Sequence, residues 1–347
     1  MENQSQPTVF SSSARNLWRA VEPSIWTSNS DNIRRDQALS VLKTLLDQPR
    51  WLEAYLLYDE RGSQLFEQIC KLPEYYLTRT ESAILAENAG QLIRSAPVEC
   101  IAELGAGSSA KTLHLLREQV RQRGTGIFVP IDVSLPSLVA SREIVRRQLP
   151  QLSFSGLHAR YQDGVSSIEK SLPTLLVFLG SSVGNFNHSD FVQFFDHLSQ
   201  CMGPRDFLLL GVDRVKEAEV LEKAYDDPKG VTADFILNVF QNINRIMNCN
   251  FDAGKMRYHS WYNREWQQVE MYAVSTASQE IRFPSYGASF SWPKDDRILV
   301  EISRKFDPVR LQHQLQWFGL KPVEHFTDPK EWFSLLLFQK ANSSESG

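Results

Sequence analysis

The sequence contains little that would hold a disulfide framework or a metal ion. Only 4 of its 347 residues are cysteines, and they lie far apart at positions 70, 100, 201 and 249. This scatter is typical of reduced thiols and disfavours a disulfide framework or a cysteine zinc site. The 7 histidines show no metal-ligand spacing either. We therefore expect no metal.

Membrane and nucleic-acid signals are also missing. No run of about 18 apolar residues occurs, and the first residues lack the apolar core of a signal peptide. The net charge is −4 and no basic block is present, which disfavours a nucleic-acid partner. These absences predict a cytoplasmic protein with a small-molecule substrate and no membrane partner. We expect a monomer.

The composition is globular, with 42% hydrophobic and 22% charged residues. From Val98, strand-like runs such as VECIAELGAG, GIFVPIDVS and TLLVFLGSSVGN alternate with amphipathic helical runs, as in βαβ units. LSFSGLHARYQDG is a further candidate strand in this series. Residues 216–305 instead indicate helices followed by antiparallel strands, and the alternating pattern returns after 306.

The pattern predicts a doubly wound α/β sheet with a second lobe. The sheet domain is expected over 98–215 and 306–340, and the lobe over 36–97 and 216–305, with the active site where they meet. Residues 1–35 are expected to be a loose extension and 341–347 a loose tail.

A glycine loop, Glu103-Leu104-Gly105-Ala106-Gly107, ends one predicted strand and opens a helix. A G-x-G pattern is weak by itself, but the carboxylate of Glu103 next to it disfavours a phosphate and favours an amine. S-adenosylmethionine (SAM) carries an ammonium group and no phosphate, so it suits this loop better than NAD. The alternative is a tight strand-to-helix turn without a ligand.

Two further acids follow strands at positions where a nucleoside needs acceptors. Asp132 follows the second strand and can accept both ribose hydroxyls. Asp163 precedes Gly164 at the end of the third strand and can accept from the adenine amino group. For either acid the alternative is a helix N-cap.

Several long segments resemble the histidine-specific Nα-methyltransferases of ergothioneine biosynthesis and their fungal relatives that methylate tryptophan-derived amines. They are YDERGSQLFEQICKLPEYYLTRTE, ELGAGSSAKT, VPIDVS, FLGSSVGNF, AYDDPKGVTADF and VEISRKF, in family order from Tyr58 onward. The resemblance implies a Rossmann-like SAM-dependent methyltransferase fold with a substrate-binding lobe. It also implies that SAM is bound and S-adenosylhomocysteine released.

The resemblance further implies roles for particular residues. Cofactor binding falls to Gly105, Lys111, Asp132 and Asp163, beside Glu103, Gly107 and Gly164. Tyr58 and Phe66, the expected catalytic residues, would wall the substrate amine together with Tyr75, while Asn185 and Tyr225 would hold the substrate carboxylate, and Glu301, Ser303 and Met271 would contact the ring. Glu301 and Ser303 lie two apart on a predicted strand and so share one face. Without the resemblance, this pair reads as an exposed strand face, Met271 as core and Lys111 as a solvated helix residue.

By resemblance, the expected reaction is SAM-dependent Nα-trimethylation of L-histidine to hercynine. The alternative is N-methylation of tryptophan or another aromatic amino acid. A carboxylate facing the ring suits imidazole, which has two polar nitrogens, better than indole, which has one donor. An NAD-dependent oxidoreductase, a macromolecule-directed methyltransferase and a silent SAM-binding scaffold are the rival classes.

Overall fold

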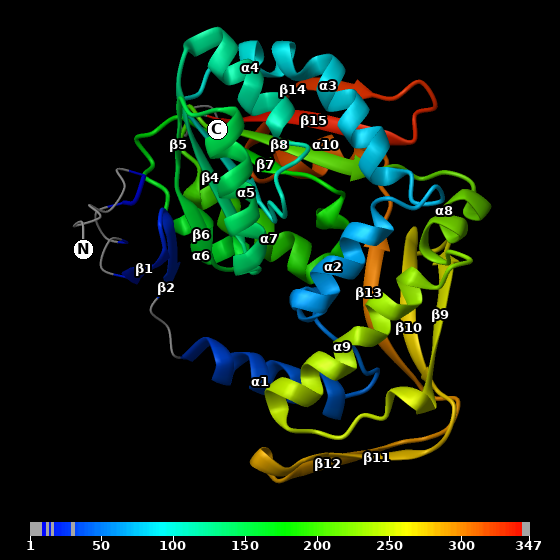
Figure 1. Cartoon of the computed structure of the whole chain (residues 1–347). Coiled ribbons are helices and arrows are strands. Elements are labelled where there is room, and N and C mark those ends of the chain that lie inside the picture. Colours follow the sequence, from blue (N-terminus) through cyan, green and yellow to red (C-terminus); the bar gives the residue numbers. More distant parts are fainter. Residues whose placement is uncertain (1–8, 12–13, 15–16, 29–31, 342–347) are drawn as a thin grey trace. The chain divides into compact units, whose positions relative to one another are not determined.

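The computed structural model describes residues 9–11, 14, 17–28 and 32–341, and the chain divides into two compact units (Figure 1). Unit 1 comprises residues 1–29, 77–215 and 306–347, and unit 2 comprises residues 30–76 and 216–305.

A mixed β-sheet forms the centre of unit 1. Its strands are β1 (Trp18–Glu22), β2 (Ile25–Ser28), β3 (Cys100–Leu104), β4 (Gly126–Asp132), β5 (Leu152–Phe154), β6 (Gly156–His158), β7 (Thr174–Phe178), β8 (Phe207–Asp213), β14 (Leu320–Thr327) and β15 (Phe333–Lys340). The order is β1-β2-β6-β4-β3-β7-β8-β15-β14, and β5 pairs with β4. The strands from β6 to β8 are parallel, whereas β14 and β15 are antiparallel additions at one edge.

The strand order reverses at β3, which has β4 on one side and β7 on the other. Ligands of open α/β sheets bind beyond the carboxyl ends of the strands at such a reversal. Strands β3, β7 and β8 are buried along their whole length, which explains their continuous apolar runs. The residues that follow β3, β4 and β7 are therefore the ones placed to meet a ligand.

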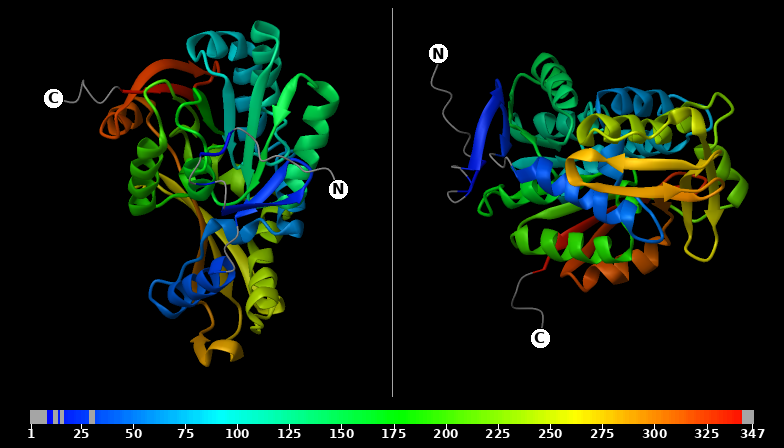
Figure 2. Two further views of the ribbon diagram at one scale, coloured as in Figure 1. Left: turned by 90° about the vertical axis from the view of Figure 1, so that its left-hand side faces the viewer. Right: turned by 90° about the horizontal axis from the view of Figure 1, so that it is seen from below.

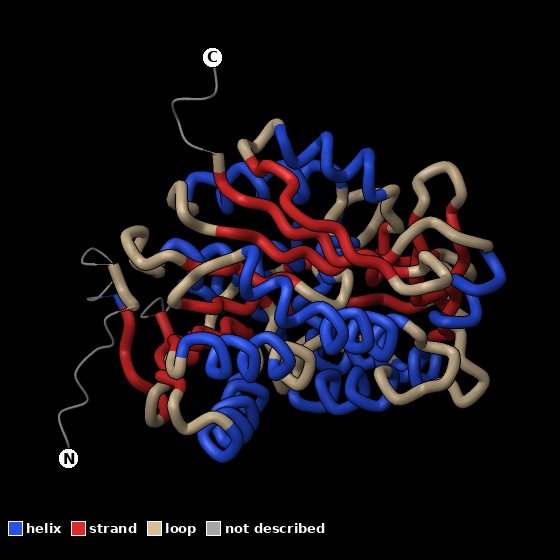
Figure 3. Tube along the Cα trace, turned by 90° about the horizontal axis from the view of Figure 1, so that it is seen from above, coloured by secondary structure: helices blue, strands red, loops and turns tan. Residues whose placement is uncertain are grey.

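Helices cover both faces of this sheet (Figures 2 and 3). They are α3 (Leu77–Ser95), α4 (Leu113–Arg123), α5 (Leu135–Gln148), α6 (Tyr161–Ser166), α7 (His188–Cys201) and α10 (Pro308–Gln316), with a short 3-10 helix η3 (Ser182–Asn185). This doubly wound arrangement confirms the predicted fold class.

The sheet domain includes helix α3, so its second segment begins at residue 77 and not at the predicted residue 98. The helix contacts α4, β14 and β15, which are all parts of unit 1. Its apolar face, which includes Leu85 and Leu92, is fully buried. Packing of this face explains why α3 belongs to the sheet domain and not to the second lobe.

The predicted loose extension over 1–35 is wrong for residues 18–28, because these residues form β1 and β2. Trp18 and Trp26 are nearly fully buried, and both rings contact Phe10. The indole N–H of Trp18 donates to Ser167 Oγ at 2.9 Å. Burial of these large rings holds the segment against the sheet. Residues 1–8, 29–31 and 342–347 lie outside the described residues, and with them most of the predicted tail.

The single strand predicted across residues 152–164 is instead two short strands followed by a helix. Strands β5 and β6 are separated by Ser155, and α6 begins at Tyr161. Consequently Asp163 lies in the first turn of α6 and not at the end of a strand.

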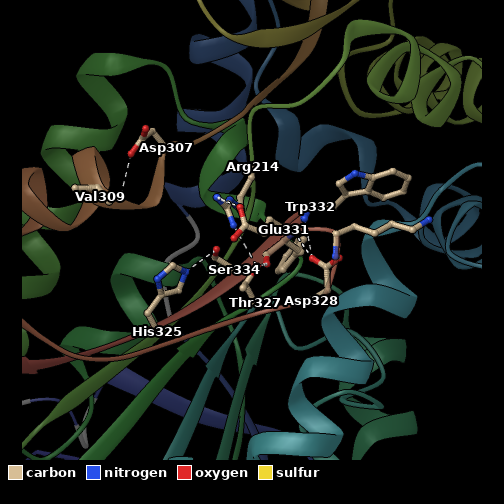
Figure 4. A network of polar contacts seen from close by, with 11 residues as sticks. Arg214, Asp307, Val309, His325, Thr327, Asp328, Glu331, Trp332 and Ser334 are labelled. Carbon is tan, nitrogen blue, oxygen red and sulfur yellow. Dashed lines mark hydrogen bonds and ion pairs between the residues drawn. The ribbon is translucent and has the colours of Figure 1, made fainter.

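Polar contacts hold the turn between β14 and β15 (Figure 4). Asp328 Oδ1 accepts the backbone N–H groups of Trp332 and Phe333, each at 2.8 Å. Arg214, directly after β8, donates to Thr327 at 3.3 Å and to Glu331 at 3.2 Å. These contacts tie the antiparallel edge to β8.

Unit 2 has helices followed by antiparallel strands, which matches the pattern predicted for 216–305. Its elements are α1 (Asn32–Leu46), η2 (Ala54–Leu57), α2 (Glu60–Ile69), α8 (Ala218–Tyr225), α9 (Val231–Met247), η4 (Ala253–Lys255), β9 (Met256–Asn263), β10 (Gln268–Ser275), β11 (Gln279–Phe283), η5 (Pro284–Tyr286), β12 (Ala288–Trp292) and β13 (Arg297–Arg304). The strands form a β13-β10-β9 sheet and a β11-β12 hairpin. Helix α9 contacts α2, β9 and β10.

Candidate cofactor and substrate sites

The loop between β3 and α4 has the conformation that its glycines allow. Gly105 and Gly107 have φ angles of 69° and 50°. A Cβ at Gly107 would meet no atom within 4 Å, so this glycine borders open space. A Cβ at Gly105 would lie 3.0 Å from the Tyr161 hydroxyl oxygen. The loop therefore lets a ligand approach the backbone most closely at Gly107.

Glu103, the last residue but one of β3, is a buried acid with one unused oxygen. Its side chain is 3% exposed, and one carboxylate oxygen accepts from the Thr112 hydroxyl. The other oxygen, Oε2, is buried and has no hydrogen-bond partner. Burial raises the pKa of Glu103 to about 8. An ammonium group would supply the missing partner and restore the charged form, so this residue fits the amino group of SAM.

Asp132 is the last residue of β4, and its side chain hydrogen-bonds to the glycine loop that follows β3. One of its oxygens accepts from the Gly107 N–H and the other from the Ser134 N–H, each at 2.8 Å. Burial raises its pKa despite these two hydrogen bonds. The N-cap of α5 is Ser134, whose hydroxyl accepts from the Ser137 N–H. Asp132 therefore shapes the glycine loop and is not the cap of α5.

Asp163 and Gly164 lie together in α6, but they differ in their surroundings. Asp163 is exposed, so its carboxylate is open to a ligand. Gly164 is buried, and a Cβ there would lie 2.5 Å from Ile131 Cγ2 of β4. Close packing of α6 on β4 thus explains this glycine without a ligand.

Lys111 is not a solvated helix residue, because it precedes α4 and forms an ion pair with Glu81 of α3. Glu81 is fully buried, and its two oxygens accept from the Gly180 N–H at 2.8 and 2.9 Å. A Cβ at Gly211 would lie 2.0 Å from Glu81 Oε1, which explains a glycine inside β8. The sequence reasoning did not identify Glu81 as a site residue, since a glutamate in an amphipathic helix normally faces water.

Asn185 ends η3, just after the carboxyl end of β7. It therefore lies in unit 1 with the cofactor candidates, whereas the other predicted substrate residues lie in unit 2.

Unit 2 gathers the predicted aromatic residues into one cluster. The rings of Tyr58 and Phe66 have centroids 5.6 Å apart, and that of Phe66 lies 6.3 Å from Tyr75, which in turn lies 5.9 Å from Tyr225. Phe235 of α9 joins the cluster at 5.6 Å from Tyr58 and 5.7 Å from Phe66. The sequence reasoning missed Phe235, because an aromatic residue in an apolar helix is normally read as core.

The predicted ring-contacting residues lie together on the sheet of unit 2. Met271 of β10 pairs directly with Glu301 of β13. Glu301 and Ser303 are 9% and 6% exposed, so they do not form an exposed strand face. Ser303 Oγ and the Tyr225 hydroxyl oxygen are 2.8 Å apart, and Lys305 Nζ donates to both. The hydrogen bond between Ser303 and Tyr225 links a predicted ring contact to a predicted carboxylate contact. Sequence reasoning did not identify Lys305.

Among the described residues, no group of three or more His, Cys, Asp or Glu side chains is placed to hold a metal ion. Nor does any helix in this part of the chain have the length and apolarity needed to cross a membrane.

Comparisons with known proteins identify the family of the chain. A family profile described as "Histidine-specific methyltransferase, SAM-dependent" matches residues 35–340. The chain is 34% identical to a histidine N-alpha-methyltransferase of Mycobacterium tuberculosis, covering 89% of this chain and 95% of that protein. It is 30% identical to ergothioneine biosynthesis protein 1 of Neurospora crassa, covering 92% of this chain and 38% of that protein. Identity to an L-tryptophan methyltransferase of Psilocybe serbica is 27%, over 87% of this chain and 92% of that protein.

These matches place the chain among the SAM-dependent methyltransferases. Within that class, it belongs to the histidine-specific family, and the resemblance inferred from the motifs is confirmed.

Proposed function

We propose that this chain transfers methyl groups from SAM to the α-amine of L-histidine and produces Nα,Nα,Nα-trimethylhistidine (hercynine), a step of ergothioneine biosynthesis. Family membership supports the reaction class. The observation that carries the choice of histidine is the buried pair of polar side chains on β13, Glu301 and Ser303. Two polar partners suit the two nitrogens of imidazole, whereas indole has one donor and a large apolar face.

The cofactor is assigned to unit 1. When bound, SAM supplies a methyl group activated by the sulfonium. Glu103 would pair with the ammonium group through Oε2, and Lys111 would face the carboxylate while Glu81 holds it in place. Asp132 and Asp163 would accept from the ribose and the adenine.

The amino acid is assigned to the aromatic cluster and β13 of unit 2. For Asn185 of unit 1, the family resemblance is what supports a role toward the substrate carboxylate. The amine must be neutral to act as a nucleophile, so its ammonium form loses one proton to solvent before each transfer. Each transfer then forms one N–C bond and breaks the bond between the methyl carbon and the sulfur, which leaves as the thioether of S-adenosylhomocysteine. The Tyr58 hydroxyl would orient the lone pair of the amine, so positioning supplies most of the catalysis. The faces of Tyr58 and Phe66 would stabilise the growing positive charge by about 0.5–2 kcal/mol.

The test is mass spectrometry of products formed from the purified protein, SAM and each standard amino acid in turn. Trimethylated histidine as the sole product would support the proposal. Methylated tryptophan would replace histidine as the substrate, and the absence of any methylated amino acid despite bound SAM would refute the assigned activity. A reaction with Glu301→Ala serves as the matched control for ring recognition.

A further inference from the structure

Helix α6 carries Asp163, the acid assigned to the adenine amino group, and a distant part of the chain packs against this helix. We call residues 9–11, 14 and 17–28 the N-terminal segment, which includes β1 and β2. This segment lies outside residues 35–340, where the family profile matches, so the family resemblance assigns it no role. Its contacts on both sides of α6 suggest one.

Before α6, the N-terminal segment pairs with β6, the strand that leads into the helix. Strand β2 runs parallel to β6, and Trp26 lies opposite Leu157 in this pairing. The Thr27 hydroxyl donates to the backbone oxygen of His158, the last residue of β6, at 3.1 Å. Strand β2 therefore fixes the course of the chain as it enters α6.

After α6, the same segment pairs with the chain again. Phe10 and Ile168 form an antiparallel bridge. Next to this bridge, the Ser11 N–H donates to the backbone oxygen of Ser167 at 3.0 Å. Ser167 is the C-cap residue of α6. The N-terminal segment thus holds the helix at both of its ends.

Two hydrogen bonds in series connect the N-terminal segment to Asp163 itself. The indole N–H of Trp18 donates to Ser167 Oγ at 2.9 Å, and the Ser167 hydroxyl donates to the backbone oxygen of Asp163 at 2.7 Å. Both directions are fixed, because an indole N–H only donates and a carbonyl oxygen only accepts. Trp18 and Ser167 are 4% and 5% exposed, so water has little access to either bond.

Ring packing keeps the Trp18 side chain in place. The Phe10 ring stacks on that of Trp18 with centroids 5.6 Å apart, and it meets the edge of Trp26 at 5.8 Å. All three rings are nearly fully buried. A side chain enclosed in this way has little freedom to change its rotamer, so the indole N–H stays directed at Ser167.

On its other side, α6 contacts the elements assigned to the cofactor. Gly164 packs against Ile131 of β4, and the Tyr161 hydroxyl oxygen lies 3.0 Å from the position of a Cβ at Gly105. Helix α6 therefore lies between the N-terminal segment and the glycine loop. A shift of α6 would move the exposed carboxylate of Asp163 relative to a nucleoside bound at this loop.

We propose that Trp18 is a positioning residue that fixes Asp163, through Ser167, as the acceptor for the adenine amino group, so that the N-terminal segment sets the preference of the site for adenine. The inference rests on the cofactor assignment of the proposed function. An amino group donates to a carboxylate, whereas the carbonyl oxygen of hypoxanthine in the same position only accepts. A correctly placed Asp163 therefore distinguishes the two bases.

Calorimetry with S-adenosylhomocysteine and with S-inosylhomocysteine measures this discrimination. In the second ligand, a carbonyl oxygen replaces the adenine amino group. We expect the wild type to bind S-adenosylhomocysteine about tenfold to a hundredfold more tightly, which is the usual effect of a hydrogen bond to a charged group. Asp163→Ala should remove most of this preference, and it sets the value expected for a lost contact.

Trp18→Phe keeps an aromatic ring and removes the N–H donor. We expect this variant to reduce the preference by about threefold to tenfold, the effect of one neutral hydrogen bond. Ser167→Ala should have the same effect, and it decides the question if circular dichroism shows that Trp18→Phe is unfolded. Trp26→Phe is the matched control, because it makes the same change in the same ring cluster and leaves the bond to Ser167 intact. It should keep the wild-type preference.

The possible failures can be told apart. A wild-type preference in both Trp18→Phe and Ser167→Ala, or an equal loss of preference in Trp26→Phe, would overturn this inference alone. Equal binding of the two ligands by the wild type would overturn the role of Asp163 and this inference with it, while the product assay decides the methylation of histidine separately. Absence of both S-adenosylhomocysteine binding and methylated products would overturn the proposed function as well.

Discussion

Replacing Glu103 by glutamine should change the pH dependence of stability. Burial raises the pKa of this acid from 4.5 to about 8 in the folded state. Between these values the folded protein holds a proton that the unfolded chain has released, so stability falls as pH rises. This loss of stability ends once the pH exceeds the pKa of Glu103 in the folded protein. Integrated from pH 6 to pH 8, it amounts to about 2 kcal/mol.

The glutamine variant has no such titration, and its side-chain oxygen can still accept from the Thr112 hydroxyl. We therefore expect the stability difference between Glu103→Gln and the wild type to move by about 2 kcal/mol in favour of the variant between pH 6 and pH 8. Urea unfolding at a series of pH values, with Glu87→Gln as a control at an exposed acid of α3, measures the difference. A wild-type minus Glu103→Gln difference that does not change with pH would refute the reasoning.

The same carboxylate is assigned to the ammonium group of SAM, which ties the stability effect to binding. Binding of a cation beside Glu103 should release its proton near neutral pH, because the charged form gains a partner. We expect S-adenosylhomocysteine to bind Glu103→Gln more weakly while that variant is the more stable apoprotein at pH 8. If S-adenosylhomocysteine bound the wild type and Glu103→Gln with equal affinity, Glu103 would not contact the cofactor.

Three further changes test other parts of the structure. Glu301→Ala should weaken histidine binding by about 1.5–3 kcal/mol, because a charged hydrogen bond is lost. Calorimetry should show S-adenosylhomocysteine binding nearly unchanged. Similar losses for both ligands would contradict a contact between Glu301 and the ring. Gly164→Ala should destabilise the protein by about 1–3 kcal/mol, because the new methyl would overlap Ile131, whereas Gly90→Ala in α3 should be neutral or stabilising in the same urea titration. Lys111→Met should weaken S-adenosylhomocysteine binding about tenfold or more through loss of a charged hydrogen bond, and unaltered binding would exclude Lys111 from the cofactor.

Local patterns were sufficient for much of the fold. The continuous apolar runs of β3, β7 and β8 and the helical periods between them predicted a parallel sheet, because strands buried on both faces have few polar positions. The acid and glycines at 103–107 predicted a loop suited to an amine. These features depend on neighbours in the chain, so the sequence alone reveals them.

Other features depend on contacts between distant segments. No local signal shows that Trp18 and Trp26 pack with Phe10 to add two strands, or that Gly164 is required by Ile131. The helical position of Asp163 depends on where β6 ends.

The amino-acid sequence by itself determined the family, the glycine loop and the alternation of strands and helices, because motifs and periodicity are local. Only the tertiary structure decided that Glu81 is buried against Lys111 and that Lys305 meets Tyr225 and Ser303. A charged residue in a helix or after a strand normally faces water. Its burial, and hence its chemical role, depends on partners brought together from distant parts of the chain.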